Sequence, residues 1–150
     1  MARLERPRDT GRAMSQENVE IISRLYENFL ARPERLMSPE ILEFFDPAVE
    51  IRQSASILGT EGTFHGYEGL LQSAREVIES FHDFQFVPRG IADAGDQVVA
   101  TVEFRGTGRE SGVEVRQTVA HVWALRADRI VAWHVYFDPA AGIASVRERE

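Results

Sequence analysis

One histidine lies inside one of the most apolar stretches of the chain. His121 is the middle residue of QTVAHVWAL (117–125), a run rich in valine, tryptophan and leucine that is typical of a buried β-strand. An imidazole titrates near pH ~6.5 and can exchange protons at neutral pH. If the strand borders a pocket, His121 is a candidate general acid or base. If it borders a dry core, the ring must instead be satisfied by a backbone carbonyl or a tyrosine.

The alternation of this strand predicts which residues share a face with His121. Successive side chains of a strand point to opposite faces, so the larger side chains gather on one face, namely Gln117, Val119, His121, Trp123 and Leu125. We expect this face to line the pocket. The other face carries small residues that suit sheet-to-sheet contact with a second copy, and it predicts a homodimer through Thr118, Ala120, Val122 and Ala124.

Tyr26 is the second candidate for chemistry. Ser15 is a good N-cap for a helix over 16–31. Helical spacing then places Tyr26 on the inward face, with Val19, Ile22, Phe29 and Leu30. Its hydroxyl could polarise a bound molecule, or the ring could be an ordinary core aromatic. Trp123, Trp133 and Phe137 occupy sheet positions and are interpreted as pocket wall or core.

The remaining elements predict an α+β domain. A short helix opens at Ser38-Pro39 and carries Phe45, a strand covers 49–53, and a third helix covers 67–81. After this helix the apolar period changes to two, and four strands follow with an irregularity near Pro88-Arg89-Gly90. Helices followed by hairpin strands indicate a curved antiparallel sheet. Residues 1–13 are predicted to be a flexible N-terminal segment, 14–141 the domain, and 142–150 a polar C-terminal tail.

Composition excludes several classes of function. The 150 residues contain no cysteine and no lysine, so thiolate, disulfide, Schiff-base and Walker-A lysine chemistry are ruled out. The net charge of −7 argues against nucleic-acid binding. The four histidines show no metal-ligand spacing, and no stretch is long and apolar enough to cross a membrane. We therefore expect a cytoplasmic protein that uses no metal and no organic cofactor.

Several segments, taken in order, resemble the SnoaL-like branch of the nuclear transport factor 2-like superfamily. They are MSQENVEIISRLYENFL (14–30), FFDPAVEI (44–51), FHGYEGL (64–70), IADAGDQVV (91–99) and AHVWALRADRIVAWHVYFDP (120–139). The resemblance covers about 14–141. It implies three N-terminal helices that form a cone with a concave sheet around an apolar pocket, and a dimer through the other face of the sheet.

The resemblance also assigns roles to positions of this sequence. Tyr26 stands where ketosteroid isomerases keep the tyrosine that donates to the substrate oxyanion. The proton-moving aspartate of those enzymes would fall at about Ile51. The oxyanion aspartate, and the acid/base aspartate of SnoaL-type cyclases, would fall at His121. In limonene-epoxide hydrolases a catalytic aspartate matches Val135. The carboxylates of the known enzymes are therefore replaced here.

Two functions from different classes remain open. The first is a cofactor-independent proton-transfer enzyme of isomerase, cyclase or dehydratase type, with His121 and Tyr26 as catalytic residues. The alternative is a non-catalytic module that holds a small apolar organic ligand. A protein-interaction domain is a weaker third possibility. In either of the first two cases the predicted pocket wall consists of Trp123, Trp133, Val135, Phe137, Phe45, Ile51 and Val119.

Overall fold

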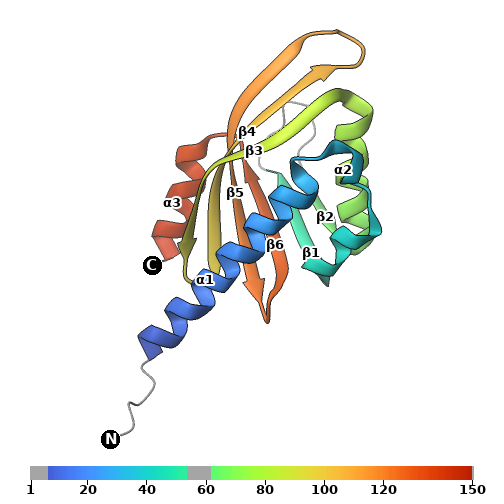
Figure 1. Cartoon of the computed structure of the whole chain (residues 1–150). Coiled ribbons are helices and arrows are strands. Elements are labelled where there is room, and N and C mark those ends of the chain that lie inside the picture. Colours follow the sequence, from blue (N-terminus) through green and yellow to red (C-terminus); the bar gives the residue numbers. More distant parts are fainter. Residues whose placement is uncertain (1–6, 54–61, 150) are drawn as a thin grey trace, which may run out of the picture.

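The computed structural model describes residues 7–53 and 62–149, which fold as helices around one sheet (Figure 1). The helical elements are α1 (Pro7–Leu25), the π-helical turn η1 (Tyr26–Leu30), the 3₁₀ turns η2 (Pro33–Arg35) and η3 (Pro39–Phe44), α2 (Gly66–Ser80) and α3 (Pro139–Arg149). The strands are β1 (Phe45–Gln53), β2 (Gly62–His65), β3 (Phe81–Ala94), β4 (Gln97–Gly108), β5 (Glu114–Arg126) and β6 (Arg129–Tyr136).

The six strands form one curved sheet in the order β2-β1-β6-β5-β4-β3. The pairs β3–β4, β4–β5 and β5–β6 are antiparallel neighbours along the chain, as hairpin connections require. The pair β1–β6 is parallel, and Ile51 lies opposite Trp133. This parallel pairing brings the early strand and the last strand together, although most of the chain separates them in sequence.

The structure confirms the predicted α+β class. The long strand after the third helix has the predicted extent, and its register shifts between Pro88 and Gly90 at the expected irregularity. Several boundaries differ from the prediction. The first helix begins at Pro7 instead of residue 16, Phe45 opens β1 instead of closing a helix, and Phe81 opens β3 instead of ending α2. Residues 1–6 lie outside the described part.

The concave face of the sheet is covered by the N-terminal helical elements. Figure 1 shows α1 crossing in front of the strands, with α2 beside β1 and β2. Ile22, Leu25 and Tyr26 have at most 1% of their surface exposed, because their helical spacing turns one apolar face toward the sheet. Val98, Ala100 and Val102 of β4 meet this layer from the sheet and are also fully buried. The helices and the sheet thus enclose one core.

The C-terminal helix α3 packs on the opposite face of the sheet. From the sequence, a polar tail was predicted from residue 142 onward, and this helix was not predicted. A β-carbon built on Gly142 would lie 2.6 Å from the β-carbon of Ala120, so glycine permits a very close approach here. Ala120 and Val122 are buried, and α3 therefore occupies part of the face that was expected to contact a second copy. The homodimer remains a prediction.

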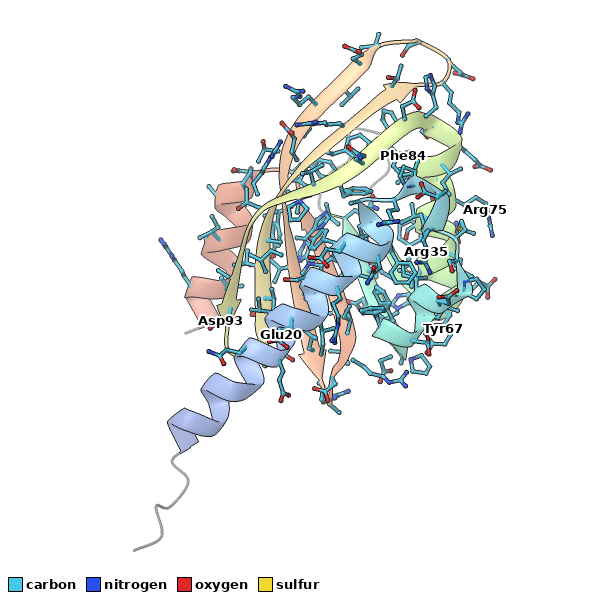
Figure 2. The ribbon with its side chains drawn as sticks, viewed as in Figure 1. Glu20, Arg35, Tyr67, Arg75, Phe84 and Asp93 are labelled. Atoms are coloured by element: carbon cyan, nitrogen blue, oxygen red, sulfur yellow. The ribbon has the colours of Figure 1, made fainter. Side chains whose placement is uncertain are left out.

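Charged side chains lie at the periphery of the fold. In Figure 2 the labelled side chains of Glu20, Arg75 and Asp93 are at the outside, and all three residues are exposed, whereas Phe84 is buried. No helix within residues 7–53 and 62–149 combines the length and apolar character needed to cross a bilayer.

The contact between α3 and β5 predicts the effect of one methyl group. We expect Gly142→Ala to destabilise the protein by about 1–3 kcal/mol, because overpacking against Ala120 outweighs the gain in helix propensity. Urea unfolding measures this difference. Gly90→Ala is the matched control, since a β-carbon at Gly90 meets no atom within 4 Å. Equal stability of the two variants would contradict the proposed close packing of α3.

Candidate functional site

A cavity lies between the concave face of the sheet and the helical elements. The cavity has a volume of about 80 Å³, which is several times the space that one buried water needs. Every lining residue that the structure describes is uncharged. The four polar ones are Gln53, Ser73, His121 and Trp133, and the others are Leu30, Leu36, Ile41, Ile51, Leu70, Leu71, Ala74, Val77, Phe81, Phe86, Phe104, Val119, Val135 and Phe137.

His121 stands in the wall of this cavity with its ring fully buried. The alternation of β5 turns it to the concave face, opposite Ala100 of β4 and Val135 of β6. Its Nδ1 lies 2.6 Å from the hydroxyl oxygen of Tyr26. Its Nε2 is also buried and has no hydrogen-bond partner among the described residues. The two ring nitrogens therefore have different environments.

Tyr26 reaches His121 from the point where α1 changes into a π-helical turn. The amide of Ala31 donates to the carbonyl of Tyr26 at 2.9 Å, a hydrogen bond that spans five residues. Such turns are rare and frequently occur at functional sites. Tyr26 is 1% exposed and is not part of the cavity lining. Its hydroxyl therefore contacts His121 on the side of the ring away from the cavity lining.

A third residue, Trp123, also binds the Tyr26 hydroxyl. The indole Nε1–H of Trp123 donates to the Tyr26 hydroxyl oxygen at 3.1 Å, and an indole nitrogen can only donate. Among the described residues, Nδ1 of His121 is then the available acceptor for the hydroxyl proton of Tyr26. A neutral imidazole that accepts at Nδ1 carries its proton at Nε2. The network thus favours the Nε2–H tautomer of His121, because in this tautomer all three groups are paired.

Burial keeps both titratable groups of this network uncharged. Desolvation lowers the pKa of His121 to about 3, so the imidazole is neutral at physiological pH. Burial raises the pKa of Tyr26 well above its ordinary value, although the hydrogen bond from Trp123 works in the opposite direction. The phenol therefore keeps its proton and remains a donor.

The predicted wall residues divide into two layers. Ile51, Val119, Trp133, Val135 and Phe137 line the cavity together with His121. Trp123 and Phe45 do not line it, because they lie in the layer behind, where both are fully buried. The indole of Trp133 stacks on that of Trp123 with ring centroids 4.4 Å apart. Trp133 is the one of the two that lines the cavity.

Much of the lining came from positions that were not proposed as site residues. Leu70, Ala74 and Val77 share one face of α2, and this helical spacing was the available signal. Phe86 and Phe104 come from β3 and β4, where alternation indicates an inward face but does not distinguish cavity from core. Leu36 and Gln53 lie in short irregular or terminal segments and carry no periodic signal. Within the described residues no cluster of side chains could hold a metal ion.

The central position of Tyr26 predicts a stability effect. Tyr26→Phe removes the acceptor of Trp123 and the donor to His121, and leaves two buried ring nitrogens unpaired. We expect a loss of about 2–5 kcal/mol in the free energy of unfolding, since each buried unpaired group costs about 1–3 kcal/mol. Tyr67→Phe is the control, because it removes one part-buried hydrogen bond to the carbonyl of Phe45. If both variants lose the same amount, the network does not have this role.

The low pKa of His121 predicts the pH dependence of stability. The unfolded chain takes up a proton on this residue near pH ~6.5 and the folded chain only near pH 3, so stability is lost as pH falls through this interval. The contribution of His121 approaches about 1.4 kcal/mol per pH unit. Urea unfolding at pH 7, 6 and 5 should show a shallower decline for His121→Asn than for the wild type. Parallel declines would mean that His121 titrates normally in the folded chain.

A family model described as the SnoaL-like domain matches residues 22–133. No curated protein matches the chain. Among solved structures, an NTF2-like protein of unknown function from Burkholderia pseudomallei has 24% identity and a TM-score of 0.69, and the match covers 87% of this chain and 97% of that one.

Two further solved structures share the fold at lower identity. TerC, co-crystallised with polyporic acid, has 22% identity and a TM-score of 0.69 over 87% of this chain and 98% of that one. A protein of ketosteroid isomerase-like fold from Catenulispora acidiphila has 15% identity and a TM-score of 0.65 over 85% and 92%. At these identities the likeness concerns the fold alone. The family match spans most of the chain, and the chain therefore belongs to the SnoaL-like domain family.

Proposed function

We propose that this chain binds a small, mostly apolar organic molecule in the cavity, and that His121 supplies the principal polar contact. The observation that carries the proposal is the environment of the His121 ring. Nδ1 is hydrogen-bonded to the hydroxyl of Tyr26, which lies outside the cavity lining. Nε2 has no described partner, and the rest of the wall is mostly apolar. Ligand sites commonly combine an apolar lining with a few fixed polar groups.

The lining supports a ligand without charge. No Asp, Glu, Lys or Arg is among the described lining residues, so nothing there would compensate a buried ion. Leu70, Val77 and Phe104 present only carbon atoms to the cavity, from α2 and β4. Protein cores are normally close-packed, so a persistent apolar cavity of this kind is more readily explained by binding than by packing.

Two of the similar structures were solved with small organic molecules. TerC was crystallised with polyporic acid, and the Catenulispora acidiphila protein was solved in complex with trimethylamine. These are small organic molecules, although they differ in chemistry from one another. They support small-molecule binding by this fold and leave the identity of the ligand to the residues of this chain.

Filling the cavity provides the direct test. Two neutral probes, 1-tetralone and 1-methylenetetralin, have an apolar bicyclic body, and their binding can be followed by the fluorescence of Trp133 at the wall. We expect saturable binding by the wild type and a loss of about tenfold or more in Ala74→Phe, because the larger ring occupies the cavity. Ala144→Phe, on the exposed side of α3, is the control. No saturable binding of either probe by the wild type would refute the proposal.

A proton-transfer enzyme is the second candidate function, and the short contact between Tyr26 and His121 favours it. In the alternative tautomer, Nδ1–H donates to the Tyr26 oxygen and the lone pair of Nε2 faces the cavity as a base. Two features oppose this role. The pKa of about 3 makes neutral His121 a weak base, and no carboxylate is among the described lining residues. The geometry therefore favours hydrogen-bond donation over proton abstraction.

Isotope exchange separates the two functions. Proton abstraction from C2 of 1-tetralone in D₂O replaces that hydrogen by deuterium, and mass spectrometry follows the exchange. We expect a rate within about tenfold of the buffer rate, because general-base catalysis normally contributes about 10²–10⁴-fold and a base with this pKa falls short. His121→Gln is the control, since it cannot titrate. A larger acceleration in the wild type that His121→Gln abolishes would establish the enzyme instead.

A further inference from the structure

Two buried ring nitrogens of residues in the cavity wall lack a partner. Among the side chains described, those of residues 16–53 and 62–147, His121 Nε2 and Trp133 Nε1 are the two buried polar atoms without a hydrogen bond. Buried polar groups in proteins are nearly always paired, and each exception needs an explanation. Both residues line the same cavity. The inference below rests on the proposed function, because it names the ligand group that this wall recognises.

The two rings are neighbours on the concave face of the sheet. His121 of β5 pairs with Val135 of β6, and Trp133 lies two residues before Val135 on the same face. The ring centroids of His121 and Trp133 are 5.3 Å apart, and the ring planes are inclined by 77°. A single ligand atom at this part of the wall can therefore contact both residues.

Each ring is held in place by the layer behind it. Tyr26 fixes the orientation of His121 through Nδ1, and Trp123 supports Trp133 by stacking at an interplanar angle of 17°. Trp123 also donates to Tyr26, so the two supports are joined to one another. Groups that are fixed before a ligand arrives lose little conformational freedom on binding.

The chemistry of the pair specifies the group that it binds. The indole nitrogen can only donate, and in the tautomer that the contacts of Tyr26 favour, Nε2 of His121 is a donor too. Two donors require an acceptor with two lone pairs. A carbonyl oxygen has them and carries no proton, whereas a hydroxyl brings a proton of its own and an ammonium group has no lone pair. A carboxylate would bury a charge beside a lining without cations.

We propose that His121 Nε2–H and Trp133 Nε1–H together bind the carbonyl oxygen of an uncharged, otherwise apolar ligand. The carbonyl lies against β5 and β6, and the body of the ligand extends toward the apolar face of α2 around Ala74 and Val77. The pair makes the site selective for a ketone over a hydrocarbon of the same shape.

An isosteric pair of probes tests this selectivity. In 1-methylenetetralin a CH₂ group replaces the oxygen of 1-tetralone, so the two molecules differ little in shape. We expect the wild type to bind 1-tetralone more tightly by about tenfold, the usual scale for one or two new hydrogen bonds. The chain has two tryptophans and thus two indole N–H resonances, of which only Trp123 has a described hydrogen-bond partner. The ketone should move the Trp133 resonance downfield, and the alkene should not.

Conservative variants assign the effect to the two donors. Trp133→Phe removes one N–H and keeps an aromatic ring. His121→Asn keeps an acceptor for Tyr26 near the Nδ1 position but has no group at Nε2. We expect each to reduce the preference for the ketone to about threefold or less, while binding of the alkene changes little. Phe104→Leu is the control, because it changes the lining without removing a donor and should affect both probes alike.

The possible outcomes are distinct. If the ketone and the alkene bind equally and move the Trp133 resonance in the same way, the donor pair does not bind the oxygen, although the cavity still binds ligands. If neither probe binds, the proposed function fails and this inference fails with it. Should a variant not fold, the carbonyl stretching frequency of 1-tetralone bound to the wild type decides the question. A shift to lower frequency supports the hydrogen bonds, and an unshifted band overturns them.

Discussion

The site depends on one chain of hydrogen bonds, from Trp123 to Tyr26 to His121. The phenol has a single proton and stands between two ring nitrogens, one of which can only donate. Nδ1 is the acceptor that the described residues offer to the phenol proton, and this arrangement therefore favours the Nε2–H tautomer of His121. These hydrogen bonds also connect the π-helical turn η1 to β5, because Tyr26 belongs to η1 and both of its partners belong to β5. Loss of the phenol oxygen would loosen orientation and packing together.

The wall of the cavity has two layers of side chains, which differ in their roles. Trp123, Tyr26 and Phe45 form the inner layer, where they are almost completely inaccessible to solvent. His121 and Trp133 form the layer that meets the cavity, and each is supported by a ring of the inner layer. The inner layer contributes apolar burial and rigidity, and the outer layer contributes two ring nitrogens that have no described partner. A sheet can supply both layers because neighbouring strands place aromatic residues side by side on one face.

The sequence predicted which face of each helix or strand points inward, but it did not predict which inward residues reach the cavity. Alternation along β5 and helical spacing through α1 and η1 placed His121 and Tyr26 on facing sides, and the structure brings them into contact. Periodicity cannot show which inward residue is covered by another, so Trp123 was expected in the pocket wall although Trp133 stacks over it. The helix α3 was not predicted because PAAGIASVRER is rich in small residues and its apolar positions are few. Its packing depends on the absence of a side chain at Gly142, a property of the tertiary contact with Ala120.

Burial of His121 has opposite consequences for catalysis and for recognition. Desolvation lowers the pKa of the imidazole to about 3, which makes the ring a poor base. The same desolvation keeps the ring neutral, so that the proton at Nε2 stays in place while Tyr26 occupies Nδ1. A solvated histidine would exchange protons readily but would not hold one donor in one direction. The described lining also lacks a carboxylate that could raise this pKa or accept a proton. The features that weaken proton transfer in this cavity are therefore the features that suit its wall to the proposed role of a fixed hydrogen-bond donor.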